Sequence, residues 1–101
     1  MYKKNIVIYG ATGSIGESTL SLIRNNRKNF NVIGLTCNEN ITKISRIANE
    51  FDCKNIGIAN KELIVQNKTL LKNYTIFAGI DEFQNMISDN AVDIIIFAIS
   101  G

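Results

Sequence analysis

Three glycines near the start of the chain have the types and spacing to hold a phosphate group. Gly10, Gly13 and Gly16 form the pattern G-x-x-G-x-x-G. Glycine lets the chain turn sharply, and it lets backbone N–H groups approach an anion with no Cβ in the way. A helix that follows adds unpaired N–H groups and the positive end of its dipole. Because the spacing is a variant of the G-x-G-x-x-G dinucleotide fingerprint, the pattern predicts a nucleotide phosphate site.

The segments on either side of these glycines are those that such a site requires. Ile6-Val7-Ile8-Tyr9 is a short apolar run typical of a buried strand, and a helical pattern over residues 14–26 follows the turn. The residues expected on the buried face of this helix are Ile15, Thr19, Leu22 and Ile23. An alternative stays open, in which the glycines only make a tight turn and Ser14 forms a capping box with Glu17.

The rest of the chain alternates strand and helix patterns. Strands are expected at residues 30–36, 56–59, 74–78 and 92–99, and helices at about 41–51, 61–72 and 83–87. Asn40 or Thr42 is the expected N-cap of the second helix. Five strands that alternate with helices predict an α/β fold, a Rossmann-like doubly wound parallel sheet. The length of 101 residues allows one domain, residues 1–101.

The last predicted strand, residues 92–99, is almost entirely apolar. Residues 92–99 form an almost unbroken apolar run of the kind found in strands that are covered on both faces. No helical pattern follows this run. We therefore expect a sheet that is incomplete at its carboxyl-terminal end, with an uncovered apolar surface there.

Composition narrows the possible partners. The chain is 46% hydrophobic and 20% charged with a net charge of +2, and its basic residues are scattered, so we expect no nucleic-acid partner. It has no histidine, and Cys37 and Cys53 lack a metal-ligand spacing, so neither predicts a metal site. No run reaches the ~18 apolar residues of a membrane span, and the first strand follows directly on Met1–Lys4. These features predict a cytoplasmic protein without a membrane partner.

The end of the second predicted strand bears on which dinucleotide would bind. NAD sites usually place an acidic residue there, on the ribose hydroxyls, but Thr36 and Cys37 occupy the position in this chain. The missing acid would have repelled a 2′-phosphate, so its absence favours NADP. Glu39 argues the other way, because its carboxylate would repel that phosphate, and no Arg or Lys stands beside it to pair with one. Asn38 and Asn40 suit either a cofactor loop or a turn and a helix cap.

With these motifs in place, the chain resembles the amino-terminal cofactor domain of the 1-deoxy-D-xylulose 5-phosphate reductoisomerase family. The resemblance covers all 101 residues, but only about the first quarter of a family member. The residues that carry it are Gly10-Ala11-Thr12-Gly13-Ser14-Ile15-Gly16 with Ser18-Thr19-Leu20, Phe30-x-Val32, Asn38-x-Asn40-Ile41 and Ala98-Ile99-Ser100-Gly101.

The resemblance implies an enzyme of non-mevalonate isoprenoid biosynthesis, a homodimer at full length. It rearranges a phosphosugar, 1-deoxy-D-xylulose 5-phosphate, and reduces the product to 2-C-methyl-D-erythritol 4-phosphate with NADPH. A divalent metal, Mg or Mn, is implied with its ligands beyond Gly101, so the chain alone is expected to be inactive. The cofactor contacts implied by the resemblance and by the turn are Gly10, Thr12, Gly13, Ser14, Ile15, Asn38, Glu39 and Asn40.

Two positions need separate treatment within the resemblance. The family often has a basic residue at the position of Glu39, so the strength of the NADP preference stays open. Asn60-Lys61-Glu62 is similar to a lysine–glutamate motif of the family's active site, but that motif belongs after the final strand shown here. We interpret this segment as the start of a helix.

Two other functions remain possible from the residues. One is another NADP-dependent reductase with the same glycine turn, such as an extended short-chain dehydrogenase or a semialdehyde dehydrogenase. The other is a vestigial nucleotide-binding module. A Tyr-x-x-x-Lys motif beyond Gly101 would favour a short-chain dehydrogenase, and an acidic metal cluster there would favour the reductoisomerase.

Overall fold

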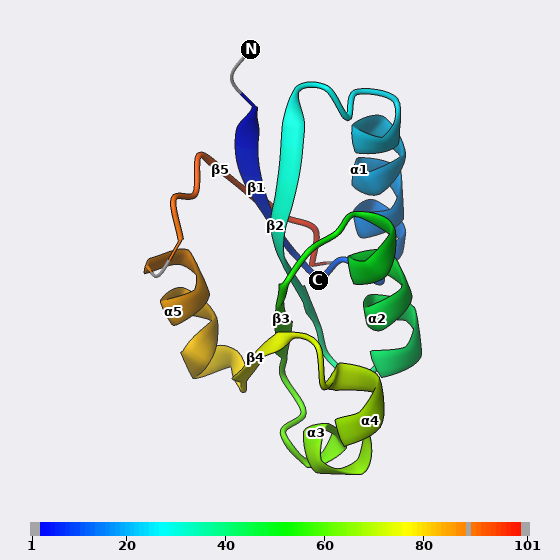
Figure 1. The fold of residues 1–101 in the computed structure, drawn as a ribbon, viewed down its shortest axis with the longest axis vertical. Coiled ribbons are helices and arrows are strands. Elements are labelled where there is room, and N and C mark those ends of the chain that lie inside the picture. The colour runs from blue at the N-terminus through cyan, green and yellow to red at the C-terminus, as the bar shows by residue number, and fades with distance from the viewer. Residues whose placement is uncertain (1–2, 89, 100–101) are drawn as a thin grey trace.

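The computed structural model describes residues 3–88 and 90–99 as a five-stranded sheet with helices on both faces (Figure 1). The elements in chain order are β1 (Lys4–Tyr9), α1 (Ser14–Arg24), β2 (Phe30–Cys37), α2 (Ile41–Glu50), β3 (Asn55–Ile58), α3 (Glu62–Gln66), α4 (Lys68–Leu71), β4 (Thr75–Ala78), the 3₁₀ turn η1 (Ile80–Glu82), α5 (Phe83–Ser88) and β5 (Ile94–Phe97). The predicted alternation of strands and helices is confirmed. Ser100 and Gly101, which contribute to the family resemblance, lie outside the described residues.

The order of the strands creates a point at which the winding of the chain reverses. All four strand pairs are parallel, and the order across the sheet is β4-β3-β2-β1-β5. The chain runs outward from β1 to β4 and then crosses to the other side of β1 to form β5. Helices α1 and α2 lie on one face of the sheet and α5 on the other (Figure 1). The doubly wound, Rossmann-like prediction is therefore confirmed, and such sheets bind ligands at the carboxyl ends of the strands beside the reversal.

The hydrophobic core has two layers, one on each face of the sheet. The larger layer packs against α1 and α2, and its largest fully buried side chains are Ile6, Ile8, Leu20, Leu35, Ile44, Ile56 and Ile58. The smaller layer packs against α5 and consists of Val7, Phe77, Phe83 and Met86. Side chains alternate between the faces of a strand, so Ile6 and Ile8 serve one layer and Val7 serves the other. This is why β1 is an apolar run without polar alternation.

The buried face of α1 differs in part from the predicted one, of which Ile23 is buried as expected. Ile15 and Leu22 were expected in the core, but they are 48% and 68% exposed. The buried residues of the helix are Gly16, Leu20 and Ile23, which also lie one helical turn apart. A pattern of large apolar residues misses this face because its first member is a glycine, whose lack of a side chain lets the helix lie against the turn. The helix also ends at Arg24 and not at residue 26.

The predicted helix over residues 61–72 is two short helices, α3 and α4. Asn67 separates them with φ −123° and ψ 31°, outside the helical region. Its side-chain amide donates a hydrogen bond to the carbonyl of Leu63 at 2.7 Å. Asparagine side chains compete with the backbone for such bonds, which accounts for the interruption. At the start of α3, the Asn60 side chain accepts a hydrogen bond from the N–H of Glu62 at 3.2 Å, which confirms that this segment begins a helix.

The expected uncovered surface lies on β5, which is an edge strand within the described residues. Ile94 and Ile96 are partly buried against the larger core layer. Ile95 and Phe97 project from the other face and are 37% and 68% exposed. Strand β5 is therefore covered on one face only, although its apolar sequence is typical of a strand that is covered on both faces.

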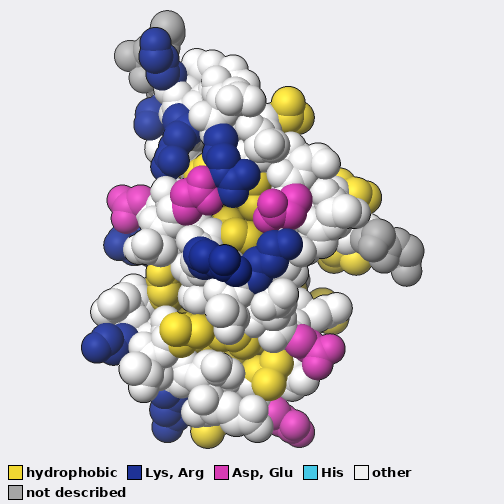
Figure 2. Space-filling view, turned by 90° about the vertical axis from the view of Figure 1, so that its right-hand side faces the viewer, with side chains coloured by type: hydrophobic (Ala, Val, Ile, Leu, Met, Phe, Trp, Pro, Cys, Tyr) yellow, Lys and Arg dark blue, Asp and Glu magenta, His cyan; other side chains and the backbone are white. Residues whose placement is uncertain are grey.

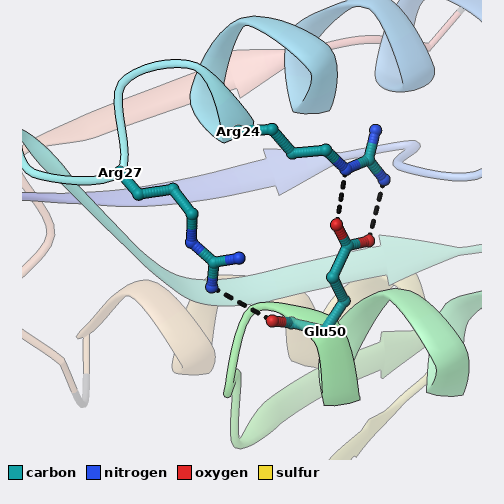
Figure 3. A network of polar contacts seen from close by, with 3 residues as sticks. All are labelled: Arg24, Arg27 and Glu50. Atoms are coloured by element: carbon teal, nitrogen blue, oxygen red, sulfur yellow. Dashed lines mark hydrogen bonds and ion pairs between the residues drawn. The ribbon is translucent and has the colours of Figure 1, made fainter.

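Charged side chains tie the ends of α1 and α2 together (Figure 3). The guanidinium of Arg24 donates two hydrogen bonds to the carboxylate of Glu50, at 2.5 and 2.8 Å. Arg27 donates to the backbone carbonyl of Glu50 at 3.0 Å. Both guanidinium groups also stand over the ring of Phe51, at 5.4 and 4.8 Å from its centroid. This network joins the carboxyl-terminal ends of α1 and α2, and that end of α1 is the one opposite the glycine turn.

The surface formed by α1 and α2 carries charges of both signs. Figure 2 shows acidic side chains standing among the basic ones across the middle of this face. Among residues 3–88 and 90–99, no helix has the length and apolar character needed to cross a membrane.

Candidate functional site

The glycine turn begins directly after β1 and needs glycine at its first position. Gly10 has φ +80°, a conformation that side chains with a Cβ rarely adopt. A Cβ built there would lie 2.9 Å from Cγ1 of Ile99 and 3.2 Å from the Ile99 backbone nitrogen. The end of β1 and the segment after β5 therefore approach each other over Gly10.

Thr36, near the end of β2, holds this turn in place. Its hydroxyl oxygen accepts a hydrogen bond from the N–H of Gly10 at 2.9 Å, and its carbonyl accepts one from the N–H of Ala11 at 2.9 Å. The side chain is buried, with 2% of its surface exposed. The position that carries an acid in many NAD sites is thus occupied here by a residue with a structural task.

The start of α1 leaves its N–H groups open on one side. Gly13 is the N-cap, with φ −83°, and no side chain caps the helix, so the capping-box interpretation of Ser14 is wrong. A Cβ built on Gly13 would meet nothing nearer than the carbonyl oxygen of Gly10, at 3.9 Å. The first N–H groups of a helix have no intrahelical partner, and no side-chain cap occupies those of α1. Such a helix start can hold an anion.

A cleft of about 260 Å³ lies next to this turn, at the carboxyl ends of the strands. Its lining comes from the glycine turn, residues 36–38, Ile80 and Phe83, and Ala98 and Ile99. Tyr9 also lines it, and its ring meets the ring of Phe83 edge to face at a centroid distance of 5.7 Å. The cleft lies at the point of strand reversal, with apolar walls and a polar edge at the turn.

The structure brings together some of the predicted cofactor contacts and not others. Those that line the cleft are Gly10, Thr12, Gly13 and Asn38. Ser14, Ile15 and Glu39 are exposed beside it. Asn40 is the N-cap of α2, and its side-chain oxygen accepts a hydrogen bond from the N–H of Lys43 at 3.2 Å, which confirms the predicted cap.

Lys43 is a residue of this region that the sequence patterns did not reveal. Its ammonium group donates a hydrogen bond to the carbonyl of Thr12 at 2.8 Å and lies 3.6 Å from a carboxylate oxygen of Glu17. Thr36 is a second residue of this kind. The sequence showed that it is uncharged, but not that it is bonded to the glycine turn. Both partners are more than twenty residues away along the chain, so no local spacing signals either contact.

The two thiols of the chain, of which only Cys37 lines the cleft, are poor nucleophiles. Burial raises the pKa of Cys37, which lines the cleft, to about 11. Burial likewise raises the pKa of Cys53 to about 11. Within the described ranges, no three His, Cys, Asp or Glu residues are grouped so that they could hold a metal ion. The site has the features of a binding site for a phosphate-bearing ligand.

Two kinds of sequence comparison agree on one family. The family model described as 1-deoxy-D-xylulose 5-phosphate reductoisomerase matches residues 6–101. The reductoisomerase of Thermoanaerobacter sp. (strain X514) is 34% identical over 99 residues, covering 97% of this chain and 26% of the relative. That of Pelagibacter ubique (strain HTCC1062) is 35% identical over 101 residues, with 97% and 26% covered. The chain thus spans about a quarter of the length of these curated relatives.

Solved structures of reductoisomerases have the same fold. The enzyme from Zymomonas mobilis in complex with NADPH superposes with a TM-score of 0.77 at 33% identity, covering 84% of this chain and 23% of that one. A reductoisomerase in complex with NADPH, fosmidomycin and magnesium superposes with a TM-score of 0.78 at 32% identity, covering 91% and 23%. With the match of the family model over residues 6–101, this chain belongs to the 1-deoxy-D-xylulose 5-phosphate reductoisomerase family.

Proposed function

We propose that this chain is the NADPH-binding part of a 1-deoxy-D-xylulose 5-phosphate reductoisomerase. The observation that carries the proposal is the open start of α1. No atom lies close to a Cβ built on Gly13, and no side chain caps the helix. The solved relative from Zymomonas mobilis, in complex with NADPH, supports the identity of the ligand. On this proposal, residues 1–101 are the amino-terminal cofactor-binding domain of a longer enzyme.

The residues present suit the two charged parts of such a dinucleotide. The pyrophosphate would lie on Gly10, Thr12 and Gly13 and on the N–H groups of Ser14 and Ile15, where the helix dipole favours negative charge. The ribose phosphate would lie at Asn38–Asn40, at the end of β2. When bound, NADPH supplies the hydride for the reduction. The role of this chain is to hold and orient the cofactor.

The proposed preference for NADPH follows from the end of β2. Thr36 is buried and bonded to Gly10. A threonine has neither a carboxylate for a free ribose hydroxyl nor a charge that repels a 2′-phosphate. Glu39 is exposed in the loop that follows β2. We infer that its carboxylate points away from the ribose phosphate, because repulsion at ~4 Å near a surface would amount to a few kcal/mol before screening by salt.

The remaining parts of the proposal concern the longer enzyme. The reaction would convert 1-deoxy-D-xylulose 5-phosphate to 2-C-methyl-D-erythritol 4-phosphate, with Mg or Mn and the phosphosugar held by residues outside this chain. A relative solved in complex with magnesium, with a TM-score of 0.80 at 31% identity, supports the metal. A cytoplasmic homodimer without a nucleic-acid partner stays a prediction from the resemblance and the composition.

Calorimetric titration of the purified protein with NADPH and NADH tests the proposal. We expect NADPH to bind more tightly than NADH, and we expect no turnover of 1-deoxy-D-xylulose 5-phosphate by this chain with NADPH and magnesium. Absence of any dinucleotide binding by the folded protein would contradict the assigned role. Tighter binding of NADH would contradict the cofactor, and turnover would show that the chain holds a reaction centre.

A further inference from the structure

Lys43 connects the two segments that the proposed function assigns to the cofactor. We propose that Lys43 is a positioning residue, which holds the glycine turn in the conformation that receives the pyrophosphate. The inference rests on the proposed function, because it assigns this residue a role at the same site. It adds a residue that lies outside the turn and does not line the cleft.

Lys43 makes one backbone and one side-chain hydrogen bond to these two segments. Its backbone N–H is bonded to the side chain of Asn40, at the end of the loop after β2. Its ammonium group, at the far end of the side chain, is bonded to the carbonyl of Thr12 at 2.8 Å. Lys43 therefore links the end of the loop to the turn.

The bond to Thr12 restrains a peptide unit that precedes the helix. The Thr12 carbonyl and the Gly13 N–H belong to one planar peptide group. Lys43 holds the carbonyl, and the N–H points to the carbonyl oxygen of Gly10 at 3.4 Å. With both ends of this unit restrained, the N–H groups of Ser14 and Ile15 that follow are presented in a fixed direction.

The charge environment favours positioning over direct contact with the ligand. The ammonium group lies 3.6 Å from the carboxylate of Glu17, and 30% of the Lys43 side chain is exposed. Its charge is thus partly neutralised, and its hydrogen bond goes to the protein backbone. The pyrophosphate is common to both dinucleotides, so loss of the bond should weaken NADPH and NADH equally.

Four variants test the inference in the purified protein. Lys43→Met removes the charge and the donor but keeps the length of the side chain, and Lys43→Arg restores both. Arg46→Met is the matched control, because Arg46 is exposed on the same helix and its loss changes the net charge equally. Lys43→Gln is a second neutral variant, and it carries the comparison if Lys43→Met does not fold. Titrations with NADPH and NADH give the affinities, and amide hydrogen exchange of residues 12–14 reports on the unliganded turn.

We expect Lys43→Met to weaken both dinucleotides about tenfold, with the ratio of their affinities unchanged, as for the loss of one charge-assisted hydrogen bond that preorganises a site. Exchange of the turn amides should be faster than in Arg46→Met, and Lys43→Arg should recover most of the affinity. Unchanged binding in the neutral Lys43 variants, equal loss in Arg46→Met, or no recovery with Lys43→Arg would each overturn the inference. A fall in NADPH affinity alone would also overturn it, since Lys43 would then meet the 2′-phosphate. If the wild-type protein binds neither dinucleotide, the proposed function fails first.

Discussion

The hydroxyl of Thr36 accepts a hydrogen bond from the backbone N–H of Gly10 at 2.9 Å. This bond joins the end of β2 to the first glycine of the turn, and the Thr36 carbonyl adds a second bond, to Ala11. The turn is therefore held from the neighbouring strand and not only by its own backbone. Many NAD sites have an acidic residue at this position, whereas here the side chain holds the glycine turn.

Replacing Thr36 with valine should destabilise the protein by ~1–3 kcal/mol, because it keeps the shape of the side chain and leaves the Gly10 N–H without its acceptor. Urea unfolding measures the change. Thr75→Val, at an exposed strand position, is the control and should stay within about 0.5 kcal/mol of wild type. Equal effects of the two substitutions would show that the bond to Gly10 contributes nothing.

Replacing Gly13 should affect binding far more than folding. The residue has φ −83°, and a Cβ there meets no close neighbour, so the unliganded turn has room for a Cβ at this position. The folding cost should be limited to a poorer N-cap, about 1 kcal/mol. Gly13→Ala should weaken dinucleotide binding, and Gly13→Val should abolish it, because the side chain occupies the space proposed for the pyrophosphate. If calorimetry shows unchanged affinity in a folded Gly13→Val variant, the pyrophosphate does not bind at this position.

Reversing the charge of Glu39 should strengthen the preference for NADPH. Lysine at this position would attract the 2′-phosphate, and we expect the ratio of NADPH to NADH affinity to rise about tenfold, or about 1.4 kcal/mol. Glu62→Lys, at an exposed position on α3, makes the same change in net charge and should leave the ratio unchanged. If Glu39→Lys behaves like Glu62→Lys, position 39 does not meet the phosphate.

The ion pair between Arg24 and Glu50 should make a small, pH-dependent contribution to stability. Hydrogen bonds from Arg24 lower the pKa of Glu50 below its ordinary value of 4.5. A carboxylate with a lowered pKa in the folded state stabilises the protein above the unfolded-state pKa, and this stabilisation is lost as the pH falls through the folded-state value. Both side chains are more than a third exposed, so Glu50→Gln should cost no more than ~1 kcal/mol at neutral pH.

Unfolding of wild type and Glu50→Gln in urea at several pH values checks this expectation. The difference in the free energy of unfolding should be largest near neutral pH and should shrink in acid below 4.5, where the wild-type carboxylate becomes protonated. Glu62→Gln serves as the control at an exposed position. A difference that does not depend on pH would mean that the charge of Glu50 is not the cause.

The sequence by itself determined the local structure of this protein. Apolar runs and helical periods located all five strands and the main helices, since these patterns reflect the backbone conformation of neighbouring residues. Glycine spacing placed the turn, and side-chain chemistry limited the cap of α2 to Asn40 or Thr42, of which Asn40 is the observed one. Each of these features depends on residues within a few positions of one another.

The tertiary structure alone decided how the site is held together. The bond between Gly10 and Thr36 spans 26 residues and that between Lys43 and Thr12 spans 31, so both depend on which strands and helices become neighbours. The buried face of α1 was also set by packing, because Gly16 lets the helix lie against the turn where larger apolar residues suggested another face. Local patterns carry no record of such contacts, since strand order and helix packing are settled only when the whole sheet assembles.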